Sequence, residues 1–250
     1  SKSKQATSRK RELEKLTIED LKPSSRKYPY VDFKFEQAIG KEILKVENLT
    51  KKGMFKNLSF NVEPDQKIVF LSSNSLVLTT LFNIIMGKEK QDGGTVFFGK
   101  TIKPSYLPQN NNEYFDDCHL SIVDWLRQYS KDKSESYVRG WLGRMLFSGE
   151  ESLKDVSVLS GGEKVRCMLA KLMLEAGNLL ILDEPVNHLD LESITSLNKG
   201  MINFKGPILF ATGDQEIIDT VANRIIDIVD ENTIIDKQMS YEEYMEKFKN

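Results

Sequence analysis

The sequence is poor in the features of secreted and membrane proteins. It holds two cysteines, Cys118 and Cys167, in 250 residues, too few for a disulfide framework, which indicates a reducing cytoplasm. No run approaches the roughly 18 consecutive apolar residues that a membrane helix needs, and no segment resembles a signal peptide. The chain starts with Ser1 inside a basic, helix-like pattern instead of with Met. We therefore expect a piece of a longer protein without a membrane part.

The charge is unevenly distributed. Residues 1–27 carry nine Lys and Arg against four Asp and Glu, a balance of +5, so the remainder carries −7 of the total of −2. A basic arm on a mildly acidic body suggests a polyanionic partner such as RNA. A solvated linker helix that is merely basic explains the charge at least as well.

The first 35 residues differ in pattern from the rest. Residues 5–22 are polar and rich in helix-forming residues, with a thin apolar stripe, which predicts a helix that packs along one narrow seam. The stripe consists of Leu13, Leu16, Ile18 and Leu21. A Pro-Ser-Ser run at 23–25 should end this helix, and an extended connector follows. We expect residues 1–35 to form a linker and residues 36–250 to form one domain.

From residue 43 onward, short apolar runs alternate with helical spacing. We expect strands at residues 43–46, 58–62, 67–71, 179–182, 207–211 and 224–229. Helical patterns occur between them, at 241–249, and through a region of about 113–160 that has no obvious strand. Buried strands separated by helices predict an α/β fold with a mostly parallel sheet covered on both faces. Residues 113–160 are then a helical insertion.

The strongest motif is composite. LSGGEK at 159–164 is followed by LLILDEP at 179–185 and NHLD at 187–190. A Ser-Gly-Gly turn at a helix start presents backbone amides and a hydroxyl to an anion, and Ser160 with Glu163 has the spacing of a capping box. Asp183 and Glu184 end a buried strand, where one carboxylate can hold Mg²⁺ and the other can orient a water molecule.

The combination LSGGEK…LLILDEPVNHLD resembles the ATP-binding cassette superfamily, and NHLDLES is similar to its soluble ABC-F branch. The resemblance covers nearly the whole chain. It implies a P-loop NTPase-like α/β fold with an antiparallel β-subdomain and a helical insertion that carries the signature helix. It also implies that residues 1–35 are the end of the linker between two cassettes, so that this would be the C-terminal cassette and its partner the N-terminal cassette of the same protein.

The resemblance assigns roles to several residues. In the family, the signature of one cassette completes the ATP site of the other. The resemblance therefore implies that the partner cassette holds an ATP that is contacted by Ser160, Gly161, Gly162 and Glu163. Asp183 would bind Mg²⁺, Glu184 would be the general base, and Gln109 would reach the metal and the water. Asp190 would lie at the cassette interface. Two alternatives stay open: Gln109 could be an ordinary polar loop residue, and Glu184 could have no catalytic duty here. His188 belongs to the NHLD loop, and we interpret it as structural.

The phosphate loop departs from the pattern G-x-x-x-x-G-K-[ST]. Residues 72–79 read SSNSLVLT: Ser72 and Val77 replace the motif glycines, Ser75 replaces a further glycine usual in the family, and Leu78 replaces the lysine. Asn74, Thr79 and Thr80 are retained, and Thr79 remains a possible Mg²⁺ ligand. Losing the lysine alone should weaken binding roughly 10- to 100-fold. A positive φ at the β-branched Val77 would cost on the order of 1–2 kcal/mol. We expect a loop over 72–78 and weak or absent ATP and Mg²⁺ at this site.

Two further departures point the same way. Gly213 stands where the family has its switch histidine, which removes a contact to the γ-phosphate. The segment KKGMF at 51–55 is short and lacks an aromatic residue for adenine to stack on, unless Phe55 substitutes.

Three functional hypotheses follow. The leading one is half of an ABC-F ATPase acting on the ribosome, with the linker directed toward tRNA. Its basic residues Lys2, Lys4, Arg9, Lys10 and Arg11 would be phosphate contacts that position without reading sequence. The alternatives are the ATP-binding subunit of a membrane transporter and a non-enzymatic scaffold cassette. Whether the isolated chain is a monomer or a homodimer stays open.

Overall fold

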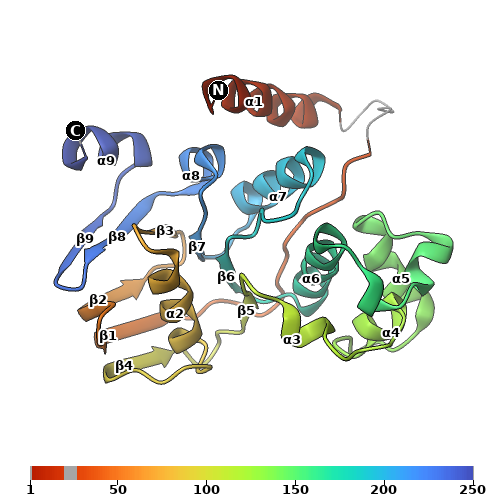
Figure 1. Cartoon of the computed structure of the whole chain (residues 1–250), viewed down its shortest axis with the longest axis horizontal. Helices are drawn as coiled ribbons and strands as arrows, with labels where there is room; N and C mark the ends of the chain where they lie inside the picture. The colour runs from red at the N-terminus through yellow and green to blue at the C-terminus, as the bar shows by residue number, and fades with distance from the viewer. Residues whose placement is uncertain (1, 20–26, 250) are drawn as a thin grey trace. The chain divides into compact units, whose positions relative to one another are not determined.

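The computed structural model describes residues 2–19 and 27–249. These residues form two compact units (Figure 1). Unit 1 comprises Ser1–Phe33, Asn110–Ala176 and Pro185–Phe204. Unit 2 comprises Lys34–Gln109, Gly177–Glu184 and Lys205–Asn250. The predicted helix end at residues 23–25 lies outside the described residues.

Unit 2 contains a six-stranded sheet in the order β5-β6-β7-β3-β8-β9. Its strands are β3 (Lys67–Ser72), β5 (Pro104–Leu107), β6 (Leu179–Asp183), β7 (Ile208–Ala211), β8 (Arg224–Asp230) and β9 (Thr233–Lys237). Every neighbouring pair is parallel except β8 and β9, which are antiparallel. The predicted mostly parallel sheet is confirmed.

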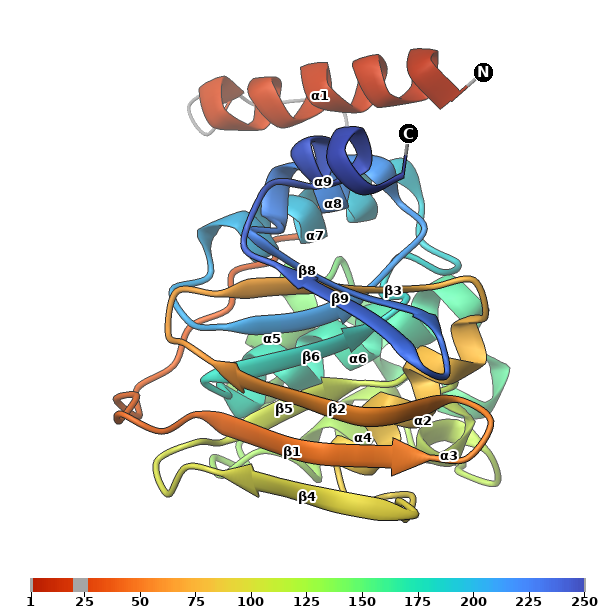
Figure 2. The same ribbon diagram turned by 90° about the vertical axis from the view of Figure 1, so that its left-hand side faces the viewer.

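A smaller antiparallel sheet of unit 2 has the order β2-β1-β4. Its strands are β1 (Leu44–Lys51), β2 (Phe55–Val62) and β4 (Gly93–Phe98). Helix α2 (Ser75–Ile85) shares one core with both sheets. Phe70 on β3 makes edge-on ring contacts with Phe60 of β2, at 5.6 Å, and with Phe82 of α2, at 5.5 Å. Figure 2 shows the two sheets one above the other, with α8 (Gln215–Val221) and α9 (Tyr241–Phe248) above the larger one.

Three strands were not expected from the sequence. β4 begins with two glycines, β5 is four residues long and starts with a proline, and β9 is mostly exposed. Glycine and proline are depleted in strands, and an exposed edge strand carries little apolar pattern. Pairing with neighbours therefore creates these strands where local propensity is weak.

Unit 1 is helical in its described part. Its elements are α1 (Lys2–Glu19), α3 (Asn112–Phe115), α4 (Ile122–Arg127), α5 (Glu135–Arg144), the 3₁₀ turns η1 (Gly149–Leu153) and η2 (Val156–Val158), α6 (Gly161–Glu175) and α7 (Leu191–Asn203). The predicted helical character of residues 113–160 is confirmed. In the part of the chain that the structure describes, no helix is long and apolar enough to cross a membrane.

Helix α1 packs on α7, and polar side chains take part in this contact. Arg9 and Glu12 are both buried, and Arg9 Nη2 donates to Oδ1 of the fully buried Asn198 at 3.1 Å. Of the predicted apolar stripe, the structure describes only the side chain of Leu13, which is half-buried, so the stripe stays a prediction. The expectation that Arg9 is a free phosphate contact is therefore wrong, because its guanidinium faces α7. Lys10 and Arg11 are exposed.

Candidate functional site

The polar residues of unit 2 meet at one edge of the larger sheet, because the carboxyl ends of parallel strands share an edge. Helix α2, which follows β3, carries Thr79, and Gln109 follows β5. Asp183 is the last residue of β6, and Glu184 comes directly after it. Gly213 follows β7. The fold thus brings together residues that lie more than a hundred positions apart in the sequence.

Thr79, Gln109 and Asp183 form a compact group of oxygen atoms. The Thr79 hydroxyl lies 2.6 Å from Oδ2 of Asp183 and 3.0 Å from Oε1 of Gln109. Mg²⁺ prefers such oxygen ligands and is commonly held by one or two carboxylates together with substrate phosphates. The described residues contain no cluster of three or more His, Cys, Asp or Glu side chains suited to a metal. The hydroxyl, amide and carboxylate oxygens of these three residues are a donor set that fits Mg²⁺.

The two carboxyl groups at the end of β6 are electrostatically perturbed. Burial raises the pKa of Asp183 to about 6, and the hydrogen bond from Thr79 opposes this rise. Burial also raises the pKa of Glu184; a hydrogen bond from the Gly213 amide, at 3.4 Å, opposes the rise, and the charge of Asp183 adds to it. Glu184 has a φ of 48°, a conformation that costs a non-glycine residue about 1–2 kcal/mol. Such strain is typical of functional sites.

The phosphate loop has a different structure from the one we expected. Helix α2 already starts at Ser75, capped by Asn74, whose side chain accepts from the Leu76 amide at 3.0 Å. The Val77 amide donates to the Asn74 carbonyl at 3.1 Å. The predicted loop over 72–78 is therefore wrong beyond Asn74. The strain predicted at Val77 is wrong as well, because Val77 lies in the helix and is not among the described residues with positive φ.

These contacts occupy groups that a phosphate loop would otherwise offer to a ligand. The amides of Leu76 and Val77 are used inside the chain and do not face a ligand. Leu78 is 6% exposed and belongs to the hydrophobic core, and Thr80 is buried too. Residues 72–80 contain no cation. The segment therefore keeps oxygen ligands for a metal, and it differs from the pattern of a phosphate loop in its bonded first amides and in its lack of a lysine.

Two other sequence departures can now be located. An added Cβ at Gly213 would meet no atom within 4 Å, so the surroundings leave room for a larger residue there. Phe55 is fully buried in the core of unit 2. The idea that Phe55 could offer its ring to adenine is therefore wrong, because that ring has no accessible face.

In unit 1 the signature turn has the predicted capping box. Ser160 Oγ accepts from the Glu163 amide at 3.2 Å, and Glu163 Oε1 accepts from the Ser160 amide at 3.1 Å. Helix α6 therefore begins at Gly161, and within the described residues the amides of Gly161 and Gly162 make no hydrogen bond. First-turn amides of this kind, with the helix dipole behind them, attract anions.

The glycines of this turn are needed for a close approach by the NHLD loop. A Cβ at Gly162 would lie 2.6 Å from the His188 carbonyl oxygen, and a Cβ at Gly161 would lie 2.9 Å from Cγ of the His188 ring. This contact supports the structural interpretation of His188. Asp190 caps α7 by accepting from the Ser193 amide at 2.8 Å, a structural duty that the sequence did not suggest.

A pocket of about 370 Å³ opens at this turn. It is lined by Ser160, Gly162, Glu163, Arg166, His188, Leu189, Asp190 and Ser193. Arg166 is absent from the motifs, although its position three residues after Glu163 places both side chains on one face of the helix. A hydroxyl, free first-turn amides and a guanidinium around one hollow can receive an anion.

Comparison with known proteins agrees with this geometry. Residues 55–187, just over half of the chain, match the family described as ABC transporter. YkpA of Bacillus subtilis, an uncharacterized ABC transporter ATP-binding protein, is 57% identical over 98% of this chain and 46% of its own length. ABC transporter F family member 5 of Arabidopsis thaliana is 32% identical, over 98% of this chain and 36% of that protein. The energy-dependent translational throttle protein EttA of Escherichia coli K12 is 32% identical, over 83% of this chain and 39% of that protein.

These relatives are all longer, and the chain spans less than half the length of each. Among solved structures, the ATP-binding cassette MJ0796, a dimer in a post-hydrolysis state with ADP and phosphate, superposes with a TM-score of 0.66. It is 16% identical and covers 79% of this chain and 99% of its own, a likeness that shows the fold. With the strand order, the signature turn and the carboxylates after β6, these matches show that the chain belongs to the ABC transporter family and is an ATP-binding cassette domain.

Proposed function

We propose that this chain is one cassette of a twin-cassette ABC-F ATPase that acts on the ribosome, and that it serves the ATP site of the partner cassette. One contrast carries the proposal. The signature turn is capped and presents two unpaired amides, whereas the place of the chain's own phosphate loop is taken by the first turn of α2. The half of the site that acts on the partner is preserved, and the half that would grip ATP in the same cassette is altered.

Each role rests on a position in the structure. The Ser160 hydroxyl donates a hydrogen bond to the γ-phosphate held by the partner, and the Gly162 amide donates a second hydrogen bond to it. Asp183 and Thr79 supply the oxygens for Mg²⁺, which would neutralise phosphate charge when bound. Glu184 orients or deprotonates a water molecule, and its raised pKa suits a base that must accept a proton. With the altered loop, these last residues work weakly or not at all in this cassette.

The ribosome as partner rests on different support. NHLDLES at 187–193 is the segment similar to the ABC-F branch, and two relatives carry names that point to that branch or to translation. The basic residues Lys10 and Arg11 are exposed on α1. Cys118 and Cys167 are free thiols, in keeping with a cytoplasmic location. We place the linker at residues 1–35 and the cassette at 36–250.

Nucleotide binding by the chain tests the proposal directly. Titration with Mg-ATP, followed by calorimetry, should show no tight binding by the unaltered chain. A variant that combines Ser75→Gly, Val77→Gly and Leu78→Lys should bind at least 10-fold more tightly, because it restores the phosphate-binding lysine and frees the backbone. The glycines are essential to the design, because Leu78 is now in the core and the first turn of α2 must unwind to release residue 78.

The matched control is Leu78→Met, which keeps the core volume and should leave both folding and nucleotide affinity unchanged. Tight, Mg²⁺-dependent binding by the unaltered chain would overturn the proposal. A folded triple variant with no gain would place the defect outside residues 75–78. If the full-length protein shows no ATPase activity at all, the scaffold alternative is preferred.

A further inference from the structure

Helix α5 carries an exposed stripe of aromatic and cationic side chains. Tyr137, Trp141 and Arg144 follow one another at i, i+4 and i+7, so they lie on one face of the helix. Tyr30, from the connector after α1, joins this face, because its amide donates to the Arg144 carbonyl at 2.7 Å. We call Tyr137, Trp141, Arg144 and Tyr30 the aromatic ladder. All four belong to unit 1.

The members of the ladder are in contact with one another. The guanidinium carbon of Arg144 lies 4.2 Å from the centre of the Trp141 ring and 5.6 Å from the centre of the Tyr30 ring. Trp141 meets Tyr137 edge-on, with 6.3 Å between the ring centres. Yet the ladder is not a core: Tyr30 is 55% exposed and Tyr137 is 41% exposed. Large rings that are held rigidly and left open to solvent suit the capture of a flat ligand.

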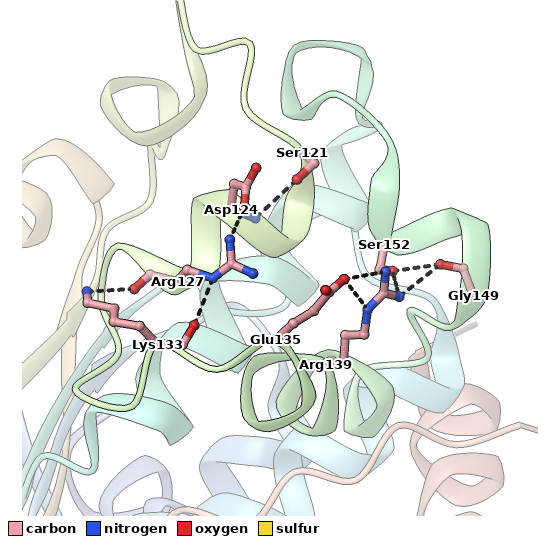
Figure 3. A network of polar contacts seen from close by, with 8 residues as sticks. All are labelled: Ser121, Asp124, Arg127, Lys133, Glu135, Arg139, Gly149 and Ser152. Atoms are coloured by element: carbon pink, nitrogen blue, oxygen red, sulfur yellow. Dashed lines mark hydrogen bonds and ion pairs between the residues drawn. The ribbon is translucent and has the colours of Figure 1, made fainter.

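The ladder also differs in charge from its neighbourhood. Figure 3 shows that Arg127 pairs with Asp124 on α4, and that Arg139 pairs with Glu135 on α5 itself. No carboxylate pairs with Arg144 in the described part of the chain. An acidic residue, Asp32, accepts a hydrogen bond from the Tyr30 hydroxyl at 3.1 Å. The charge on Arg144 therefore stays available for an anion.

The sequence continues this positive charge beyond the ladder. Tyr30 follows Lys27 by three residues, and residues 1–27 have a net charge of +5. Aromatic rings interleaved with arginine, next to a basic segment, are the combination that binds unpaired nucleotides: the rings stack on bases, and the cations meet phosphates. A buried apolar partner would instead require a surface without an unpaired cation.

We propose that the aromatic ladder stacks unpaired bases of single-stranded RNA, with Tyr30 and Tyr137 as the outer rings and Arg144 as the phosphate contact. This inference rests on the proposed function in one respect, since the RNA would belong to the ribosome. The aromatic ladder would then be the surface of unit 1 that contacts this RNA. The recognition is by stacking and charge, so it tolerates many sequences.

Tryptophan fluorescence gives a direct measurement. The chain has two tryptophans; Trp125 is fully buried, and Trp141 is in the ladder. Titration of the chain with a 12-nucleotide oligouridylate should quench Trp141, and binding should weaken as salt rises. Tyr30→Ala, Tyr137→Ala and Arg144→Ala should each lower the affinity roughly 5- to 100-fold in an anisotropy assay with labelled RNA.

Matched variants distinguish the contribution of ring stacking from that of charge, and both from the effect of removing any exposed side chain. Tyr30→Phe keeps the ring and should stay within about 2-fold of the unaltered chain. Arg144→Lys keeps the charge but loses the planar group, so it should fall between the unaltered chain and Arg144→Ala. Lys131→Ala removes one exposed charge near α5, and Phe97→Ala removes an exposed ring from unit 2. Both should bind RNA nearly normally.

The outcomes separate this inference from the proposed function. Unchanged RNA affinity in all three alanine variants, with unchanged melting temperatures, overturns the ladder. Loss of ribosome binding in those variants without any oligonucleotide binding also overturns it, and points to a protein partner instead. If the full-length protein fails to bind ribosomes while this chain binds RNA through the ladder, the proposed function fails and the ladder stands.

Discussion

At the scale of single residues, close approach is the strongest constraint at the signature turn. Sequence motifs suggest that Gly161 and Gly162 are there for a phosphate. The structure adds a second reason, since the backbone of His188 leaves no room for a Cβ at Gly162. A change at this position therefore affects folding as well as nucleotide chemistry, and the two effects must be measured separately.

We predict that Gly162→Ala destabilises the chain by about 1–3 kcal/mol, the usual effect of overpacking. Urea unfolding should show this as a lower midpoint with an unchanged slope. Gly213→Ala is the control, because an added Cβ at Gly213 meets no atom within 4 Å, and its stability should change by less than about 0.5 kcal/mol. Equal effects of the two substitutions would contradict the role of His188.

Lys67 makes stability depend on pH. Burial, together with the smaller effect of the nearby charge of Lys205, lowers the pKa of Lys67 from 10.5 to about 8. The unfolded chain then binds more protons than the folded one between about pH 8 and 10.5, so stability should rise with pH across this window. Because the side chain is only half-buried, solvent screening limits the effect to about 1 kcal/mol.

The variant that tests this is Lys67→Met. It should be the more stable protein at pH 7, and its chemical unfolding free energy should lose the rise between pH 8 and 10.5. Lys131→Met, at an exposed position, should keep that rise. A pH profile that is identical in Lys67→Met and the unaltered chain would show that another group is responsible.

At the scale of elements, two helix starts have different backbone hydrogen bonding, and the proposed function rests on this difference. Helix α6 starts with a capping box and two unpaired amides, whereas α2 starts at Ser75 and uses its first amides for its own cap. Both starts obey ordinary capping chemistry. In α6 the first amides belong to glycines and have no partner among the described residues, whereas in α2 the amides of Leu76 and Val77 bond to Asn74.

Substitutions at Ser160 separate capping from ligand contact. Ser160→Ala should lose about 1 kcal/mol of stability, because the Glu163 amide loses its acceptor. Ser160→Asp keeps a capping oxygen and should unfold at nearly the same denaturant concentration as the unaltered chain. Both should reduce the ATPase activity of the full-length protein, Ser160→Asp by at least about 10-fold, because a carboxylate repels the γ-phosphate.

Normal ATPase activity in Ser160→Asp would contradict the proposal that the signature turn contacts ATP held by the partner cassette. Asp190→Asn is a comparison for stability, since an asparagine at position 190 still caps α7 and introduces no negative charge at the signature turn.

At the scale of the whole molecule, α1 has two different faces. Arg9 is buried against Asn198 of α7, whereas Lys10 and Arg11 are exposed. Three consecutive basic residues thus differ in their surroundings: Arg9 contacts α7, whereas Lys10 and Arg11 are open to solvent. The charge asymmetry of the sequence is real, but fewer cations are available to a partner than a count suggests.

We predict that ribosome binding by the full-length protein weakens steeply with salt. Combining Lys10→Gln with Arg11→Gln should lower the slope of log affinity against log salt concentration by about 1–2. Arg9→Gln should leave this slope unchanged and lower the stability by about 1–2 kcal/mol. Sedimentation with ribosomes over a salt series, with urea unfolding in parallel, checks both. A slope that changes equally in the two variants would contradict this division of duties.

The parallel sheet was predictable because its buried strands are continuous apolar runs bounded by turn signals. Strands β4, β5 and β9 were not, because they are short, glycine- or proline-containing, or exposed, and exist only through pairing with neighbours. Among the candidate site residues, the capping box of Ser160 and Glu163 was readable from their spacing. The burial of Phe55 and of Leu78 was not, since neither residue carries a local signal of its solvent exposure.

The sequence by itself determined which chemical groups exist: the signature serine and glycines, the two carboxylates after a buried strand, and the missing lysine at position 78. These are matters of composition at fixed spacing, so they need no coordinates. Only the tertiary structure decided where the groups point. It turned residues 75–78 into the first turn of a helix, set the His188 backbone against Gly162, buried Arg9 and joined Tyr30 to Arg144. The last three of these outcomes depend on neighbours distant in the chain, whose packing no local pattern encodes.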